Sequence, residues 1–269
     1  MPPDFEVSYL KIREFTSGIP EEPLCLSAFT VRTMIQAAGE ITELWLAGNG
    51  TVGGRMRCQP AIQPGSGQYL QAYAPELPGC FSVTLFVSEQ DKSDLLLAPP
   101  LPDGWRVGTR LVVRGPFGRG FRLPGEACRV SLGALEDAPY RLLPLIRQAL
   151  AQQAMVTLYT HHPLNCEGHI PQQLPVAVEV LPLESLHEAV EWADFLALDV
   201  RLESISTLPA RLNLLPGQHC PCPTQVLVVA SMPCSGAAEC GVCSVRTRRG
   251  WVLACKDGPV FDLNALEMG

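Results

Sequence analysis

The sequence lacks any long uninterrupted apolar run, and this absence argues against an ordinary membrane-spanning helix. No stretch of its 269 residues approaches the ~18 consecutive apolar residues that such a helix needs. Positive charge is also scarce, because 20 Lys and Arg residues face 27 Asp and Glu, for a net charge of −7. That balance argues against binding to nucleic acid or to an anionic membrane surface.

Two further features of a secreted protein are missing. The first residues, MPPDFEVSYLKIREF, carry charges and no apolar core, so we expect no signal peptide. The 11 cysteines are odd in number and mostly scattered singly, which argues against a disulfide framework and for a reducing compartment. We therefore expect a cytoplasmic protein with free or metal-bound thiols.

Four cysteines near the C-terminus form the most informative pattern in the chain. Cys234, Cys240, Cys243 and Cys255 follow the spacing C-x5-C-x2-C-x11-C, one residue longer in the first gap than the plant-type C-x4-C-x2-C loop of [2Fe–2S] proteins. Glycines within the loop allow the backbone to curl around inorganic sulfide. Four thiolates would also suit a structural zinc ion, and unligated buried thiols are the third alternative.

A specific motif surrounds these cysteines. The stretch VASMPCSGAAECGVC, followed by VLACKDGPVF, resembles the cluster-binding tail of the electron-transfer subunit of class B dihydroorotate dehydrogenase, an iron–sulfur flavoprotein of the ferredoxin-NADP reductase superfamily. Cys255 and the segment 257–261 reproduce the family's C-x-D-G-P-V-F. The first half of the motif departs from the family, with Ser235 in place of a glycine and one inserted residue.

The resemblance implies a multidomain α+β fold. We expect an antiparallel, ferredoxin reductase-like β-barrel that binds FAD in the family (1–123), a degenerate α/β NAD-binding-like domain (124–222) and a small [2Fe–2S] module (223–269). Short apolar runs broken by Gly, Pro and Asn-Gly between about 25 and 123 agree with a barrel. Segments 67–69 (GQY) and 115–121 (GPFGRGF) are similar to barrel segments of the family.

The flavin segments differ from the family pattern. Where the family has R-P-x-S, with an Arg for the pyrophosphate, this chain has Gly79-Cys80-Phe81-Ser82. Where the family begins a phosphate-binding helix with G-T-x-x-L, this chain offers residues 93–97, SDLLL, and places a carboxylate there. FAD therefore stays an open alternative.

The residues left to contact a flavin are Gln68, Tyr69, Phe81 and Ser82. Aromatic side chains at alternating strand positions are also typical of a barrel core, so Tyr69 and Phe81 have a purely structural interpretation.

The segment that binds NAD in the family also departs from the family pattern in this chain. The family's G-G-G-I-G-x-A-P turn corresponds to residues 132–139, LGALEDAP, in which one glycine survives. Glu136 and Asp137 would oppose a pyrophosphate, and we expect them to cap the following helix, predicted over 140–152. We infer from the sequence that NAD binding has been lost. Strands are predicted at about 128–132, 156–161 and 195–200, and a second helix near 183–192.

Two other groups of residues stand out near the cysteine motif. The basic residues Arg246, Arg248, Arg249 and Lys256 flank it, and they are either a solvated turn or a docking surface for an acidic partner. His219, Cys220 and Cys222 form a Pro-rich segment that is either a plain linker or a second metal site.

The leading hypothesis from the sequence is a non-catalytic electron-transfer subunit. A [2Fe–2S] cluster on Cys234, Cys240, Cys243 and Cys255 would exchange electrons with a redox protein in a larger oxidoreductase complex, without NAD. The alternatives are an FAD-containing reductase subunit of a dihydroorotate dehydrogenase-like complex and a structural zinc-binding scaffold subunit.

Overall fold

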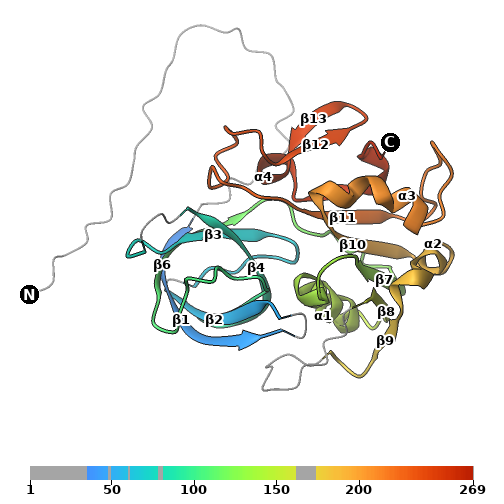
Figure 1. Ribbon diagram of the computed structural model, residues 1–269. Helices are drawn as coiled ribbons and strands as arrows, with labels where there is room; N and C mark the ends of the chain where they lie inside the picture. The colour runs from blue at the N-terminus through green and yellow to red at the C-terminus, as the bar shows by residue number, and fades with distance from the viewer. Residues whose placement is uncertain (1–34, 48–49, 60, 78–80, 162–173, 269) are drawn as a thin grey trace, which may run out of the picture. The chain divides into compact units, whose positions relative to one another are not determined.

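The computed structural model describes residues 35–47, 50–59, 61–77, 81–161 and 174–268. The start of the predicted barrel and the predicted flavin positions Gly79 and Cys80 lie outside the described residues. The described residues form a closed antiparallel barrel and a mostly parallel sheet (Figure 1). The predicted fold class is confirmed.

The barrel consists of six antiparallel strands that close in the order β1-β2-β5-β4-β3-β6. Its strands are β1 (Ile35–Leu46), β2 (Val52–Gln59), β3 (Tyr69–Tyr73), β4 (Val83–Asp91), β5 (Asp94–Leu97) and β6 (Arg110–Phe117). Alternate residues of β1 and β2 face inward, and the interior is filled by apolar side chains such as Ile41, Met56 and Val113.

Residues 93–97 correspond to the phosphate-binding helix start of the family, and in this structure residues 94–97 form strand β5. Leu95, Leu96 and Leu97 are all buried there, and β5 pairs with both β2 and β4. Consecutive leucines in a strand point to opposite faces, so both faces of β5 are buried. In this barrel the burial outweighs the helix propensity of leucine. The described segment after β5, up to β6, contains turns and bends but no helix.

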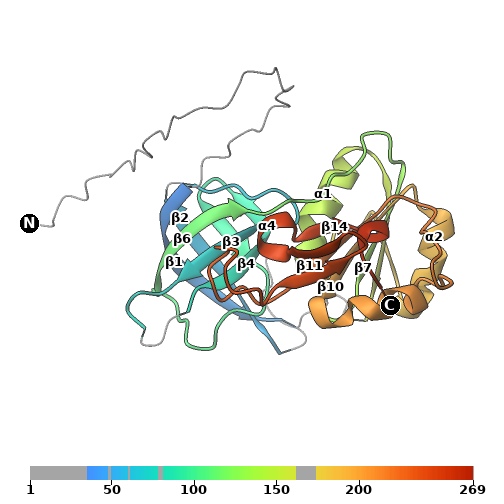
Figure 2. The ribbon, with the colours of Figure 1, turned by 90° about the horizontal axis from the view of Figure 1, so that it is seen from above.

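The second layer is a six-stranded sheet in the order β14-β11-β10-β7-β8-β9 (Figure 2). Its strands are β7 (Arg129–Ala134), β8 (Met155–Thr160), β9 (Val178–Leu181), β10 (Phe195–Arg201), β11 (Thr224–Val229) and β14 (Val260–Asp262). All neighbours are parallel except β14, which pairs antiparallel with β11. The predicted strands near 128–132, 156–161 and 195–200 are confirmed as β7, β8 and β10.

Short helices connect the parallel strands. The helical turn η1 (Pro139–Leu142) runs into α1 (Leu143–Ala151), and η2 (Leu183–Glu188) runs into α2 (Ala189–Trp192), so both predicted helices are confirmed. A further pair, η3 (Leu202–Thr207) and α3 (Leu208–Arg211), precedes β11. None of the helices in the described part of the chain is long and apolar enough to cross a membrane.

The C-terminal region combines a hairpin with the last strand of the sheet. Strands β12 (Ser244–Thr247) and β13 (Gly250–Leu253) form the hairpin, followed by α4 (Ala254–Asp257), β14 and η4 (Leu263–Ala265). Because β11 and β14 flank this region in the chain and pair with each other, the sheet fixes where the cysteine segment begins and ends.

Candidate iron–sulfur site

The four predicted ligands come from one loop and one short helix. Cys234, Cys240 and Cys243 lie in the loop between β11 and β12, and Cys255 lies in α4. Ser235, Gly236, Ala238 and Gly241 adopt left-handed backbone conformations, with φ of 56°, 78°, 63° and 71°. Left-handed residues in a tight loop can turn successive N–H groups toward one side, which forms an anion-binding concavity.

The four thiols are coupled electrostatically as two pairs, and within the described residues no three of them are close enough together to hold a metal ion. Cys234 pairs with Cys240, and Cys243 pairs with Cys255. The backbone N–H of Ala238 lies close to the sulfurs of both Cys234 and Cys255, so the two pairs are neighbours. A two-iron cluster takes two protein ligands on each iron, whereas a structural zinc ion takes all four on one centre.

The loop backbone stabilises negative charge on the first of these sulfurs. The N–H of Glu239 is the strongest donor to Cys234, and together with the contact from Cys240 and the N–H groups of Cys240 and Ala238 it lowers the pKa of this thiol to about 6. N–H groups directed at sulfur are the donors that also stabilise a bound iron–sulfur cluster. The residues present therefore fit such a cluster.

The two pairs differ in their exposure. Cys243 and Cys255 are buried, while Cys240 is exposed and Cys234 is half-buried. Burial, followed by the contact with Cys243, raises the pKa of Cys255 to about 12. The site therefore has one protected side and one side that faces solvent.

Tyr69 connects the barrel directly to this site. It is fully buried, and its hydroxyl donates to the Cys255 carbonyl at 2.9 Å, while its ring stacks on Phe117 with centroids 5.5 Å apart. A side chain on Gly236 would reach the same hydroxyl at 3.0 Å. Burial, and then the neighbouring sulfurs, raise the pKa of Tyr69, so it remains a neutral donor.

The D-G-P-V-F segment packs against the barrel and holds the cysteine site next to it. Asp257 accepts the N–H of Leu253 at 3.0 Å across α4. Gly258 has no room for a Cβ, which would lie 2.4 Å from the Phe261 ring, and its carbonyl accepts the N–H of Arg119 at 2.6 Å. The G-P-x-G-x-G-F segment of the barrel and the C-terminal motif therefore pack against each other, which explains their glycines without a ligand.

The predicted flavin contacts are largely engaged within the protein. Gln68 accepts the Gly65 N–H at 2.8 Å and donates to the Gly118 carbonyl at 2.9 Å. Ser82 donates its hydroxyl to Gln71 at 2.9 Å, and Phe81 is 79% exposed. The structure brings Tyr69 to the cysteine site, and it leaves Phe81 on the surface.

A groove of about 610 Å³ lies beside Ser82, between the barrel and the sheet. Asp137, Arg141 and Arg201 line its polar side, and Met232 and Val242 of the cysteine loop line another part. We call it the switch-point groove, because β7 and β10 are the adjacent parallel strands from which the chain order departs in opposite directions. Ligands of open α/β sheets bind at such a position.

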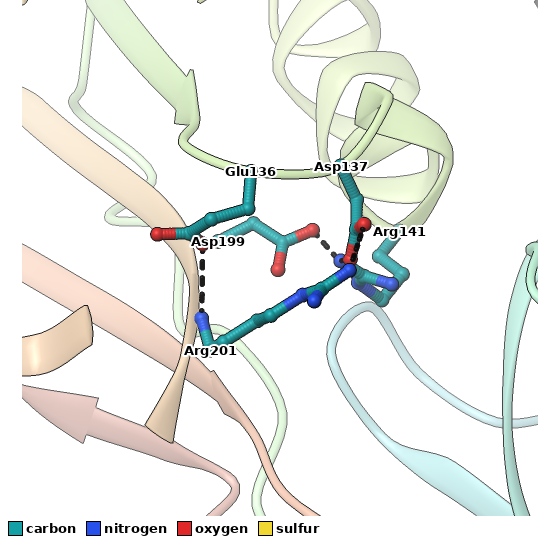
Figure 3. A network of polar contacts seen from close by, with 5 residues as sticks. All are labelled: Glu136, Asp137, Arg141, Asp199 and Arg201. Carbon is teal, nitrogen blue, oxygen red and sulfur yellow. Dashed lines mark hydrogen bonds and ion pairs between the residues drawn. The ribbon is translucent and has the colours of Figure 1, made fainter. Parts of the chain in front are cut away.

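A network of ion pairs occupies the polar side of the switch-point groove (Figure 3). Arg141 contacts Asp199 at 2.8 Å and Asp137 at 2.7 Å, and Asp137 also contacts Arg201 at 2.7 Å. Arg141 and Asp199 are almost completely buried, and the Arg141 guanidinium lies 5.9 Å from the Phe86 ring of the barrel.

The arginines of this network all have carboxylate partners, while Asp199 Oδ1 is buried without a hydrogen bond. Although burial alone would raise it, the pKa of Asp137 is lowered, because bonds from Arg201 and Arg141 outweigh the burial. Burial raises the pKa of Asp199, and the two carboxylates raise the pKa of Arg141 despite its burial. Both arginines at this edge of the sheet are therefore already paired with carboxylates of the chain itself.

The expected capping role of Glu136 and Asp137 is wrong. The helical turn begins after Ala138, with no side-chain hydrogen bond at its cap and no acidic residue in its first turn. Glu136 instead accepts the backbone N–H of Arg201 at 3.1 Å, and Asp137 binds the arginines. The physical reason is that a buried guanidinium needs paired carboxylates more than the helix end needs a cap.

The sequence reasoning missed Arg141, Asp199 and Arg201. An Asp in the middle of an apolar strand, in LALDVR, was the available signal, since a buried carboxylate requires a partner. Gly133, the one glycine retained in the nucleotide segment, also has a packing role. A Cβ there would lie 2.9 Å from the side chain of Leu198 and 3.0 Å from that of Leu186.

The basic residues beside the site have separate partners. Arg246 pairs with Glu267 at 2.8 Å and lies 6.0 Å from the ring of Trp251, which is 70% exposed. Arg248 contacts the ring of His219 at 2.9 Å. Arg249 and Lys256 are also exposed, so the hairpin presents cations and one large aromatic side chain beside the cysteine loop.

Comparison with known proteins agrees with this geometry. Residues 232–267 match the model of the iron–sulfur cluster binding domain of dihydroorotate dehydrogenase B, a range that contains all four cysteines. The match starts directly after β11 and runs beyond β14, so it covers the loop, the hairpin and the D-G-P-V-F segment. A search of curated proteins by sequence found no match.

Solved structures show the same fold at low sequence identity. A chain of an NADH-dependent reduced ferredoxin-NADP oxidoreductase, described in a study of flavin-based electron bifurcation, is 14% identical with a TM-score of 0.66, covering 86% of this chain and 90% of that chain. Phthalate dioxygenase reductase, described as a modular structure for electron transfer from pyridine nucleotides to [2Fe–2S], is 12% identical with a TM-score of 0.52, covering 83% and 78%.

The predicted resemblance is therefore confirmed at two levels, the C-terminal motif and the arrangement of barrel and sheet. Residues 232–267 match an iron–sulfur cluster binding domain of the dihydroorotate dehydrogenase B type, and the barrel and sheet have a ferredoxin reductase-like fold.

Proposed function

We propose that this chain is a non-catalytic electron-transfer subunit that holds a [2Fe–2S] cluster on Cys234, Cys240, Cys243 and Cys255. It relays electrons to or from a redox protein in a larger, cytoplasmic oxidoreductase complex. The observation that supports the proposal is the match of residues 232–267 to an iron–sulfur cluster binding domain, in which the Ala254 N–H donates to the Cys243 carbonyl at 2.9 Å and brings α4 with Cys255 next to the cysteine loop. Such a cluster, when bound, accepts and releases one electron at a time.

The protein itself positions and protects the cluster site. The barrel, through Tyr69, holds the backbone of Cys255 from its buried side, while Cys240 remains on the exposed side, nearest to any docking protein. Arg248, Arg249 and Lys256 would favour a partner with an acidic surface, and Trp251 would supply apolar contact area. Arg246 would join them by exchanging Glu267 for a carboxylate of the partner.

We propose further that NAD is not a cofactor of this chain. At the switch-point groove the cations that could meet a pyrophosphate are already paired with Asp137 and Asp199, and two carboxylates lie at the start of the following helical turn. Binding a dianion there would require breaking buried ion pairs, which costs several kcal/mol, about 3–5 for one partner of such a pair.

A second candidate function is an FAD-containing reductase subunit. The observation in its favour is the switch-point groove, which has room for a ring system beside Ser82 and Phe86. A third arrangement, zinc in the four-thiol site of a scaffold subunit, would remove electron transfer altogether.

One anaerobic preparation of the full chain separates these three functions. We expect about two iron atoms and two sulfides per chain, a signal of one unpaired electron on reduction, and no flavin released on denaturation. Stoichiometric flavin would establish the reductase subunit instead, and about one zinc without iron would establish the scaffold. Titration with NADH is expected to leave the cluster oxidised.

A further inference from the structure

Cys220 and Cys222 form a second sulfur centre that the proposed function does not use. They flank Pro221 just before β11, and their sulfur atoms lie 3.8 Å apart. Both side chains are nearly buried, with 5% and 7% exposure. Proline fixes one backbone angle between them, so the turn holds the two thiols on the same side.

The surroundings of the pair hold it firmly in place. The Thr224 hydroxyl donates to the Cys222 carbonyl at 3.0 Å, so its lone pairs face the two sulfurs, at 3.2 Å from Cys220 and 3.5 Å from Cys222. The Asn264 side chain accepts the N–H of Cys220 at 2.9 Å. The pair is thus built into the junction of β11 and η4.

This pair is separate from the iron–sulfur site. It precedes β11, whereas the cysteine loop follows β11, and a strand of six residues spans roughly 20 Å. Within the described residues no group of three or more His, Cys, Asp and Glu side chains is arranged to hold a metal ion, either around this pair or at the cysteine loop. The chemistry that two adjacent sulfurs can perform without a third ligand is the formation of a bond between them.

We propose that Cys220 and Cys222 form a redox-active dithiol that hydrogen peroxide closes to an intramolecular disulfide. The Cys220 sulfur attacks one peroxide oxygen, the O–O bond breaks, and a sulfenic acid forms at Cys220. The Cys222 sulfur then attacks the Cys220 sulfur, the S–O bond breaks and water leaves. The balance is two thiols and one peroxide giving one disulfide and two waters, and the sulfurs approach by about 1.7 Å.

The contact between the two thiols distinguishes Cys220 from Cys222. The hydrogen bond from Cys222 is the main cause that lowers the pKa of Cys220 to about 6, while the same contact raises the pKa of Cys222. Pro221, between the two thiols, lines a hollow of about 660 Å³ that neither thiol lines, so solvent reaches the backbone of the turn.

The test is a brief exposure of the full-length, cluster-containing protein to hydrogen peroxide, followed by denaturation, alkylation and peptide mass spectrometry. Cleavage after Leu227 separates the pair from the cluster cysteines. We expect the peptide that contains Cys220 and Cys222 to lose two hydrogen atoms in mass and both alkylation sites. The buried Cys58 should remain alkylated.

Two variants test which cysteine reacts with peroxide and which one then closes the disulfide. Cys222→Ser should yield no disulfide and a sulfenic acid at Cys220 that dimedone traps, whereas Cys220→Ser should leave Cys222 fully alkylated. Cys128→Ser, which removes an exposed thiol, should leave disulfide closure unchanged. The proposal is overturned if Cys220 and Cys222 in the wild-type protein both remain alkylated when exposed Cys128 has been oxidised. This test needs only the wild-type protein, so it remains decisive even if a variant fails to fold.

Discussion

The cysteine loop and the switch-point groove are both ligand positions of this fold, and their polar groups are arranged differently. In the loop, backbone N–H groups are directed at the sulfur of Cys234, and the N–H of Ala238 also lies near the sulfur of Cys255. In the groove, every arginine of the network already contacts a carboxylate of the chain. The polar groups of the groove are therefore engaged with one another, whereas the N–H groups of the loop are directed at sulfur.

The comparison also shows what the barrel contributes. Its segments that resemble flavin-binding segments instead hold the C-terminal motif, through Tyr69 at Cys255 and through Gly118 at Gly258 and Pro259. The barrel therefore supports the backbone of α4 and of the C-terminal motif.

The largest expected effect is the loss of the cluster when a ligand is removed. Cys243→Ser should reduce iron from about two atoms per chain to near zero, because one iron loses a thiolate in the buried pair. The measurement is iron and sulfide per chain in anaerobic preparations. Cys128→Ser, at an exposed thiol outside the loop, is the matched control and should keep full iron content. Full iron in Cys243→Ser would remove this residue from the ligand set.

The next effect concerns the buried ion pairs of the switch-point groove. Arg141→Ala should reduce the free energy of unfolding by about 3–5 kcal/mol, because it leaves Asp199 buried without its cation. Urea titration measures this loss. Arg147→Ala breaks the half-exposed pair with Glu89 and should cost less than about 1 kcal/mol. Equal losses in the two variants would mean that burial of the network has no energetic role.

The pH dependence of the free energy of unfolding tests the contribution of Asp137 to the same network. Because the pKa of Asp137 is lower in the folded than in the unfolded protein, its contribution is fully present above about pH 4 and is lost as pH falls through the folded pKa. Asp137→Asn should therefore lower the free energy of unfolding by about 2 kcal/mol at pH 7 and by less at pH 3. Urea titrations of both proteins across this range test it. A difference that grows toward acid pH would contradict the assignment.

The smallest expected effect is at the link between barrel and cluster site. Tyr69→Phe removes the hydroxyl that donates to the Cys255 carbonyl and leaves that acceptor buried, which should cost about 1 kcal/mol. The ring remains in place, so iron content should be unchanged, while Tyr69→Ala should lose both stability and iron. Urea titration and iron analysis of the two variants separate the hydrogen bond from the packing. Loss of iron in Tyr69→Phe would give the hydroxyl a larger role.

Local sequence patterns determined a large part of this protein. Alternating and buried apolar runs predicted the strands of the barrel and of the sheet, and the spacing of four cysteines with D-G-P-V-F predicted the type of C-terminal domain. These signals are readable because strand burial and metal ligation depend on residue types at short, regular intervals.

Other features were decided only by the tertiary structure, because they join residues far apart in the chain. The sequence could not pair Arg141 with Asp199, or Tyr69 with Cys255, since each contact depends on how strands and loops from separate regions come together. It also assigned Glu136 and Asp137 to a helix cap, a local role, whereas Asp137 pairs with the buried Arg141 and Glu136 accepts the backbone N–H of Arg201. Local patterns determined which elements form, and the need to satisfy buried charges and donors decided what their side chains contact.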